Sequence, residues 1–416
     1  MDMKYSNPEN KLFTALTIGS DIGIFEDEVN PTIKRFLEYC SRCGEHFSLC
    51  YTPPGYSYKS ISEGLRLFPT NSRYRFLFPL DAVSQGRKII RRWRPEVIVA
   101  QDTFFFGLVG LVLKKMFGLP LVVHYHSGFF SNPYWLAEKK YHRLMTWLGL
   151  FVSRRADAIR TVSTDIKNDL LKKGLDSERI FYATPPVEEK GFLEVNKEKE
   201  KELIGRFSLN TDKTFLFIGR LSKEKNLPMI IGAVARLSGD HPDLKLMIIG
   251  KGPEEKMLRR MALEKGLTDQ VIFTGAIPHN ELKDYIRISS ALLISSHYEG
   301  TAKVIKEAAF AGRTTISTKT SGVSDTIKDG QTGLILPVGN EPAFTDAMDY
   351  LLKNPNRSSE MGARARTFIL EKFDYKKDVD RIVNVWRQAV FMSKDRKQRT
   401  LMIPKTWANN TNRTRR

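Results

Sequence analysis

Apolar runs of strand length alternate with helical patterns along most of this 416-residue chain. The strand-length runs are continuously apolar, as expected of parallel strands that are buried on both faces. In the first half, strands are predicted at 12–18, 97–100, 121–125 and 158–161, with helices near 31–41, 82–93, 104–117 and 137–154. This order predicts an α/β domain with a parallel sheet covered by helices on both faces.

A second alternation of the same kind follows a change in composition. Pro185 and Pro186 precede the segment 187–202, which is charged and poor in strand formers, so we place a domain boundary there. Further strands are predicted at 214–218, 245–249, 271–273, 291–294, 314–317 and 333–335. The prediction is therefore two doubly wound domains, 1–190 and 191–373, followed by a terminal amphipathic helix to residue 393. Ligands of such sheets bind beyond the carboxyl ends of the strands, which here means the cleft between the domains.

The net charge of +19 is concentrated toward the end of the chain. Residues 394–416 hold eight basic side chains and one acidic side chain, with few apolar residues between them. This composition predicts a disordered basic tail. Contact with anionic lipid, nonspecific contact with nucleic acid and a purely solubilising role remain open alternatives.

Cysteine usage and hydropathy favour a cytoplasmic protein. The three cysteines, Cys40, Cys43 and Cys50, fit no common zinc spacing and are too few to staple a chain of this size, so we interpret them as thiols in a reducing compartment. The longest purely apolar run, 104–113, is too short to span a bilayer. No secretory signal is visible at the amino terminus.

A cationic segment at 85–94 has two interpretations. Five basic side chains surround Ile89, Ile90 and Trp93. Such a helix could lie on a membrane surface, but the favoured interpretation is an ordinary amphipathic helix that packs its apolar side chains against the sheet.

Two cations follow the first strand of the second domain. The apolar run 215–218 ends at Gly219, which places Arg220 and Lys225 on the loop at the carboxyl end of the strand. A guanidinium fork and a mobile ammonium group together suit a diphosphate. Taken alone, the pair is weak evidence, because cations on a loop are more often simply solvated.

The segment 295–309 is the richest in candidate chemistry. Gly300 allows close backbone approach, and the free amides of Thr301, Ala302 and Lys303 at the predicted helix start form an anion site. Glu307 lies about six residues farther on, roughly 9 Å along a helix, which is a reach suited to a ribose. Glu299, still in the loop, could accept hydrogen bonds from a sugar. The alternative is that both carboxylates are ordinary helix charges.

In this order and spacing, the motifs resemble the donor domain of glycosyltransferase family 4, the retaining group 1 enzymes with the GT-B fold. The resemblance rests on Gly219-Arg220 with Lys225-Asn226, Ile249-Gly-Lys-Gly-Pro253, Phe273-Thr-Gly275, the pair Glu299 and Glu307, Ser321-Gly-Val-Ser-Asp325 and Asp329-Gly-Gln-Thr-Gly333. It implies two facing Rossmann-like domains and a terminal helix that crosses back to the first domain. It also implies Arg220 and Lys225 on the donor diphosphate, Glu307 on the ribose, and Glu299 with the backbone of 300–303 near the transferred sugar.

The first domain carries the acceptor side of this resemblance. Leu121-Val-Val-His-Tyr-His-Ser-Gly128 resembles the strand end of the family, and His126 matches the histidine placed beside the donor sugar. The sequence departs from the family after the first strand, where Gly19-Ser-Asp-Ile-Gly23 replaces a paired-glycine loop, and after Glu299, where Gly300-Thr-Ala302 replaces the commoner Gly-Phe-Gly.

The resemblance implies a retaining transferase that moves a sugar from a nucleotide-diphosphate sugar, with UDP or GDP as the expected nucleotide, to a saccharide, a lipid-linked glycan or a lipid. No metal or other cofactor is expected, because fixed cations and helix amides would stabilise the leaving diphosphate. The basic tail makes peripheral attachment to the inner membrane face a further expectation, while no specific nucleic acid is expected. The alternatives are a GT-B phosphorylase, a sugar-nucleotide epimerase and a noncatalytic binding protein.

Overall fold

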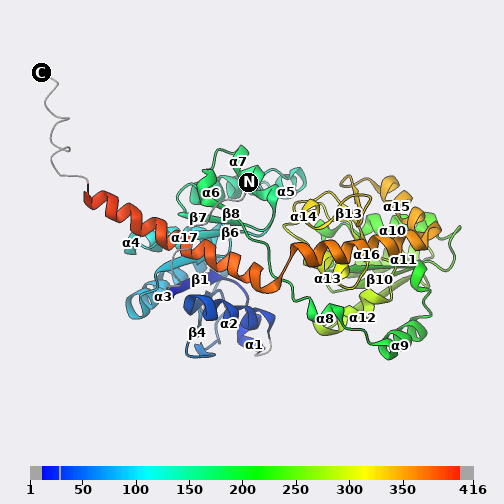
Figure 1. Cartoon of the computed structure of the whole chain (residues 1–416), viewed down its shortest axis with the longest axis horizontal. Coiled ribbons are helices and arrows are strands. Elements are labelled where there is room, and N and C mark those ends of the chain that lie inside the picture. Colours follow the sequence, from blue (N-terminus) through cyan, green and yellow to red (C-terminus); the bar gives the residue numbers. More distant parts are fainter. Residues whose placement is uncertain (1–11, 28–29, 403–416) are drawn as a thin grey trace, which may run out of the picture.

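The computed structural model describes residues 12–27 and 30–402, and only the backbone of 395–402. It has two α/β domains that lie side by side, with a long terminal helix across the first of them (Figure 1). The predicted fold class, two Rossmann-like domains built on parallel sheets, is confirmed.

The described residues of the first domain form an eight-stranded sheet in the order β3-β4-β2-β1-β5-β6-β7-β8, and only the β3–β4 pair is antiparallel. Its strands are β1 (Phe13–Gly19), β2 (Gly44–Cys50), β3 (Lys59–Ser60), β4 (Leu65–Pro69), β5 (Val97–Ala100), β6 (Leu121–Tyr125), β7 (Ala158–Thr161) and β8 (Ile180–Tyr182). Its helices are α1 (Gly23–Glu26), α2 (Pro31–Cys43), α3 (Phe78–Trp93), α4 (Phe105–Phe117), α5 (Pro133–Glu138), α6 (His142–Ser153) and α7 (Thr164–Lys172).

The second sheet is six-stranded and parallel, in the order β11-β10-β9-β12-β13-β14. Its strands are β9 (Thr214–Ile218), β10 (Lys245–Ile249), β11 (Val271–Gly275), β12 (Ala291–Ile294), β13 (Thr314–Thr318) and β14 (Leu334–Leu336). The helices are α8 (Lys190–Leu193), α9 (Lys197–Phe207), α10 (Leu227–Leu237), α11 (Glu255–Glu264), α12 (Leu282–Arg287), α13 (Lys303–Phe310), α14 (Val323–Thr326), α15 (Glu341–Lys353) and α16 (Pro355–Lys372).

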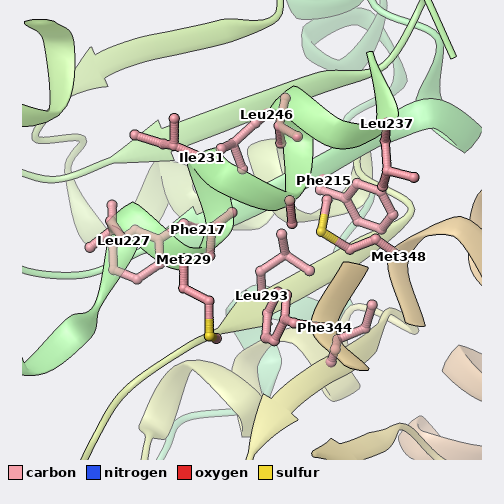
Figure 2. Close-up of a cluster of buried hydrophobic side chains, with 14 of the residues drawn as sticks. Phe215, Phe217, Leu227, Met229, Ile231, Leu237, Leu246, Leu293, Phe344 and Met348 are labelled. Carbon is pink, nitrogen blue, oxygen red and sulfur yellow. The ribbon is translucent and has the colours of Figure 1, made fainter. Parts of the chain in front are cut away.

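Alternate residues of the central strands supply separate cores on the two faces of each sheet. In the second domain, Phe215 and Phe217 of β9 face α10 and α15, where they pack with Phe344 and Met348 (Figure 2). Leu216, between them, faces the opposite cluster. This packing fixes where β9 and β12 end, and therefore where the polar loops after them emerge.

The terminal helix α17 (Tyr375–Met402) leaves the second domain and packs on the first sheet (Figure 1). Trp386 is fully buried there, its ring edge-on to Tyr39 with centroids 5.0 Å apart, and its Nε1 donates a 3.2 Å hydrogen bond to Nε2 of His124. The helix continues to Met402, so the expectation of a disordered tail from Lys394 onward is wrong for residues up to that point. The rest of the expected tail, 403–416, lies outside the described residues.

The cationic helix α3 packs as the favoured interpretation requires. Ile89 and Ile90 are buried in the core of the first domain, and Trp93 packs against Phe47 with ring centroids 5.6 Å apart. Its apolar face is therefore occupied by the protein itself. Along the described segments, no helix has both the length and the apolar character needed to span a membrane.

Candidate functional site

The loops after β6 and β7 of the first domain contact the loops after β12 and β13 of the second. Asn132 Nδ2 donates to the carbonyl of His297 at 3.1 Å, and the hydroxyl of Thr301 donates to the carbonyl of Val162 at 2.9 Å. Asp325 accepts from the backbone amide and hydroxyl of Thr164 at 2.8 and 2.7 Å. The two domains thus meet along the edge where parallel strands end.

Gly300 lies at the tightest point of this contact. A Cβ atom at Gly300 would stand 1.7 Å from the carbonyl oxygen of His126, closer than any side chain allows. The amide of Gly128 donates to the carbonyl of Glu299 at 3.3 Å beside it. The loop that carries Glu299 and the strand end that carries His126 are therefore in direct contact, and only glycine fits between them.

Lys225 and Glu299, predicted on separate strand ends, form an ion pair. Lys225 ends a 3-10 turn (Lys223–Lys225), and the Glu299 carboxylate also accepts from the Ser296 hydroxyl at 2.8 Å. Their side chains are 21% and 13% exposed, so the pair is largely shielded from water. Arg220 is exposed on the same loop. Gly219 continues the ladder beyond β9, because its amide donates to the carbonyl of Ile249 at 3.0 Å.

The helix α13 starts as an uncapped terminus beside this pair. Ala302 is its N-cap and offers no capping side chain, so the amides of the first turn remain available to an anion. Lys303 opens the helix and is accessible to solvent from the cleft. Burial in the surrounding protein, followed by the nearby charge of Arg35, nevertheless lowers the pKa of Lys303 to about 8.

Glu307 lies one turn into α13, away from the Lys225–Glu299 pair. It is buried, and burial raises the pKa of its carboxyl to about 7 although Lys303 acts in the opposite direction. The nearest basic group is His279, whose Nε2 is 3.9 Å from Oε1 of Glu307 and whose own pKa is lowered by burial. A buried carboxyl group whose pKa lies near 7 is suited to a ligand that donates hydrogen bonds to it.

His126 stands in the cleft at the end of β6. Its Nε2 donates to Oε1 of Gln101 at 3.1 Å, and the protein around it, followed by Arg160 and Arg35, lowers its pKa to about 3. The imidazole is therefore neutral at physiological pH and acts as a hydrogen-bonding group rather than a cation.

His126 also lines a cavity of about 540 Å³ in the first domain, which the sequence motifs did not reveal. Arg35 of α2 and Arg160 of β7 line it, and Lys303 of α13 reaches it from the second domain. Arg160 could have been noticed in the sequence, because it is a charged residue within an otherwise mostly apolar segment that forms a buried strand. Arg35 gives none, because a cation is ordinary on an amphipathic helix.

Two family models match successive parts of the chain. The model described as glycosyltransferase family 4 matches residues 33–189, and the model described as glycosyl transferases group 1 matches residues 198–368. Together they cover most of the chain, and they confirm the resemblance drawn from the motifs.

Individual proteins agree with the family models. The chain is 26% identical over 281 residues to the alpha-D-kanosaminyltransferase of Streptomyces kanamyceticus. The aligned region covers 67% of this chain and 72% of the relative. Among solved structures, sucrose-phosphate synthase from Thermosynechococcus elongatus superposes with a TM-score of 0.77 at 19% identity, covering 90% of this chain and 98% of the other. Anabaena Alr3699/HepE in complex with UDP and glucose superposes with a TM-score of 0.72 at 14% identity, covering 89% and 98%. These structural likenesses show the same two-domain fold.

Proposed function

The chain belongs to the group 1 glycosyltransferases of family 4, and from this premise we propose that it moves a sugar from a nucleotide-diphosphate sugar to a hydroxyl acceptor with retention of anomeric configuration and without a catalytic metal. UDP and GDP are the proposed nucleotides. One observation carries the proposal: the loop of Glu299 and Gly300 in the second domain touches the backbone of His126 in the first.

The Lys225–Glu299 ion pair gives the donor a defined way to bind. When the donor binds, two interactions replace the Lys225–Glu299 ion pair. The diphosphate of the donor pairs with the ammonium group of Lys225, and the sugar hydroxyls donate hydrogen bonds to the carboxylate of Glu299. Arg220, exposed on the same loop, adds a bidentate contact to the phosphates. The free enzyme therefore keeps both groups satisfied until the substrate exchanges with them.

Departure of the diphosphate leaves negative charge that the protein itself can stabilise. Lys225, Arg220 and the amide groups at the start of α13 supply a fixed positive field, which is the work that a divalent cation performs in other transferases. Glu307 holds the ribose at the far end of the nucleotide. His126, neutral at physiological pH, hydrogen-bonds the sugar from the first domain.

Incubation of the full chain with a panel of UDP-, GDP- and ADP-sugars tests the proposal. We expect one nucleotide sugar to be consumed, slowly by transfer to water without an acceptor, and at an equal rate in EDTA. Loss of all activity in EDTA with recovery on adding Mg²⁺ would contradict the metal-free mechanism. Turnover that requires inorganic phosphate as the acceptor would contradict the transferase proposal.

A further inference from the structure

The first-domain cavity is walled by aromatic rings and by three cations from different elements. Phe36 and Tyr39 come from α2, and Phe104 and Phe106 come from the segment that begins α4. Arg35, Arg160 and Lys303 face the same space from α2, β7 and α13. The residues that form it are separated widely in the sequence, so the cavity exists only in the folded chain.

The hydrogen bonds of the two arginines go to neutral partners. Arg35 donates to the hydroxyl of Thr32 at 3.2 Å. Arg160, only 3% exposed, donates through Nε to the carbonyl of Ala183 at 2.8 Å, and one of its terminal nitrogens lies 3.2 Å from Nδ1 of His124. Within the described part of the chain, neither arginine forms an ion pair, and Lys303 forms none either.

The two carboxyl groups that line the cavity accept hydrogen bonds from a hydroxyl and from backbone amides. Asp21 accepts from the hydroxyl of Thr32 at 2.5 Å. Asp102 accepts from the amides of Phe104 and Phe106 at 2.8 and 3.1 Å, and burial raises its pKa to about 6. Three cations therefore share one cavity without a direct ion pair to Asp21 or Asp102. Asp21 meets Arg35 only through the shared hydroxyl of Thr32, and Glu307 attracts Lys303 electrostatically.

Such an arrangement is unfavourable until an anion enters. Burial is the main reason why the pKa of Lys303 falls to about 8 and that of Arg160 to about 10, and the like charge of Arg35 adds to both shifts. A buried guanidinium without a carboxylate partner is costly to the fold. A ligand that brings negative charge removes both costs at once.

We infer that this cavity binds the phosphate group of a phosphorylated hydroxyl compound, and that this compound is the sugar acceptor. The acceptor role rests on the function proposed above. Two guanidinium groups and one ammonium group match a phosphomonoester, which carries between one and two negative charges and three strong acceptor oxygens. The aromatic walls suit the ring of a sugar or polyol attached to it.

The position of the cavity supports the acceptor role. His126 lines the cavity and also contacts Gly300 through its backbone, so a ligand anchored by its phosphate has its hydroxyls beside the donor loop. Arg220, Lys225 and Glu299 are not among the lining residues. The side chains proposed for the donor diphosphate therefore lie outside the cavity, and the start of α13 borders both sites through its amides and the Lys303 side chain.

Calorimetry on the full chain tests the anion site, with glucose 6-phosphate and glucose as paired probes. We expect glucose 6-phosphate to bind at least about tenfold more tightly, and its binding to persist in saturating UDP. Equal affinity for the two probes would overturn the inference. Displacement of glucose 6-phosphate by UDP would also overturn it, because the phosphate would then occupy the donor site.

Two variants and a matched control assign the effect to the cavity. Arg35→Gln and Lys303→Met should each weaken glucose 6-phosphate binding about tenfold. Lys34→Gln is the control, because Lys34 is the neighbouring cation on α2 but is exposed and paired with Glu188. Thermal unfolding identifies any variant that has lost its fold. Equal affinities in folded Arg35→Gln and Lys34→Gln proteins would contradict the assignment.

Proton linkage gives an independent readout. A bound phosphate dianion should raise the pKa of Lys303 from about 8, so at pH 8 the complex takes up protons from the buffer. Calorimetry in two buffers of different ionisation enthalpy measures this uptake, and Lys303→Met should abolish it. Unchanged uptake in the variant would remove Lys303 from the site.

Transfer assays separate this inference from the proposed function. A nucleotide sugar that is hydrolysed without transfer to any phosphorylated probe would overturn the acceptor role and leave the transferase intact. Tight binding of glucose 6-phosphate without consumption of any nucleotide sugar would overturn the transferase proposal and, with it, the acceptor role. Soluble phosphosugars and vesicles containing a phosphorylated inositol lipid are compared as acceptors, and transfer to either supports the inference while identifying the source.

Discussion

The two sides of the cleft are built in different ways. The second domain contributes its residues from two continuous segments, 219–226 and 295–307, and pairs its main cation with a carboxylate, Lys225 with Glu299. The first domain contributes His126, Arg35 and Arg160 from three separate elements and leaves the arginines without ion pairs among the described residues. The comparison shows that the largely shielded cation of the donor side, Lys225, has a carboxylate partner, whereas the two arginines of the proposed acceptor side have none among the described residues.

The largest effect is expected where the two sides touch. Gly300→Ala places a Cβ atom against the carbonyl of His126, so the domains must separate before the variant can fit. Misplacement on this scale should reduce transfer roughly 100-fold, as measured by initial rates. Gly205→Ala on α9 is the control, because a Cβ atom there meets open space. Equal rates in the two variants would show that the contact does not matter for transfer.

The donor side should lose nucleotide affinity when its charges are removed. Lys225→Ala and Glu307→Ala should each weaken binding of the cognate nucleoside diphosphate more than tenfold, or about 1.4 kcal/mol, by calorimetry. Lys223→Ala, an exposed cation on the same turn as Lys225, should bind normally. Affinities that match wild type in both site variants would refute the donor assignment.

Glu299 should behave differently from its ion-pair partner. Because its proposed substrate contact is the sugar, Glu299→Gln should reduce transfer about tenfold or more while changing diphosphate affinity far less. Parallel measurement of kcat and of nucleotide affinity checks this. A variant that loses nucleotide affinity and retains kcat would place Glu299 on the nucleotide instead.

Glu307 should make stability depend on pH. Its pKa is about 7 in the folded chain and 4.5 without the protein around it, so the folded state binds the extra proton between these values. Stability from this group is therefore lost as pH rises from 5 to 8, by up to about 3 kcal/mol. Glu307→Gln should flatten this part of the pH profile of unfolding, whereas Glu264→Gln, at an exposed site, should not. A profile unchanged by Glu307→Gln would show that the carboxyl is not perturbed.

The smallest effect on chemistry concerns the basic end of the chain. Deleting 394–416 removes eight cations and should lower sedimentation with anionic vesicles, in a salt-dependent manner, while hydrolysis of a soluble donor continues. The same deletion breaks the 3.0 Å contact of Lys394 with Glu96, so unfolding is measured alongside. Equal sedimentation with neutral and anionic vesicles would exclude the electrostatic attachment.

Strand prediction succeeded where burial was complete. Residues 97–100, 121–125, 158–161, 214–218, 245–249 and 291–294 form strands with the predicted bounds, since strands covered on both faces are continuously apolar. The outer strands β3 and β4 are absent from the predicted strands, because they are short and partly exposed. The predicted helix 137–154 is divided into α5 and α6, and α5 begins earlier, where Asn132 caps it and Pro133 occupies the first turn.

The residues of the candidate site also fall into two groups, those that the sequence could reveal and those that only the fold brings together. Glu299, Gly300 and Glu307 could be proposed from sequence, because their roles depend on spacing along one loop and helix. The ion pair of Lys225 with Glu299 could not, since it joins the ends of two neighbouring strands. Arg35 and Arg160 required the fold itself, because only the sheet order brings α2 and β7 to one cavity.

Proton NMR of the reaction product tests the central claim most directly. The full chain is incubated with the nucleotide sugar that it consumes, in EDTA, and the anomeric signal of the newly formed bond is compared with that of the donor. The account predicts that the donor configuration is preserved. An inverted product would contradict the retaining mechanism and the roles assigned to Glu299 and His126.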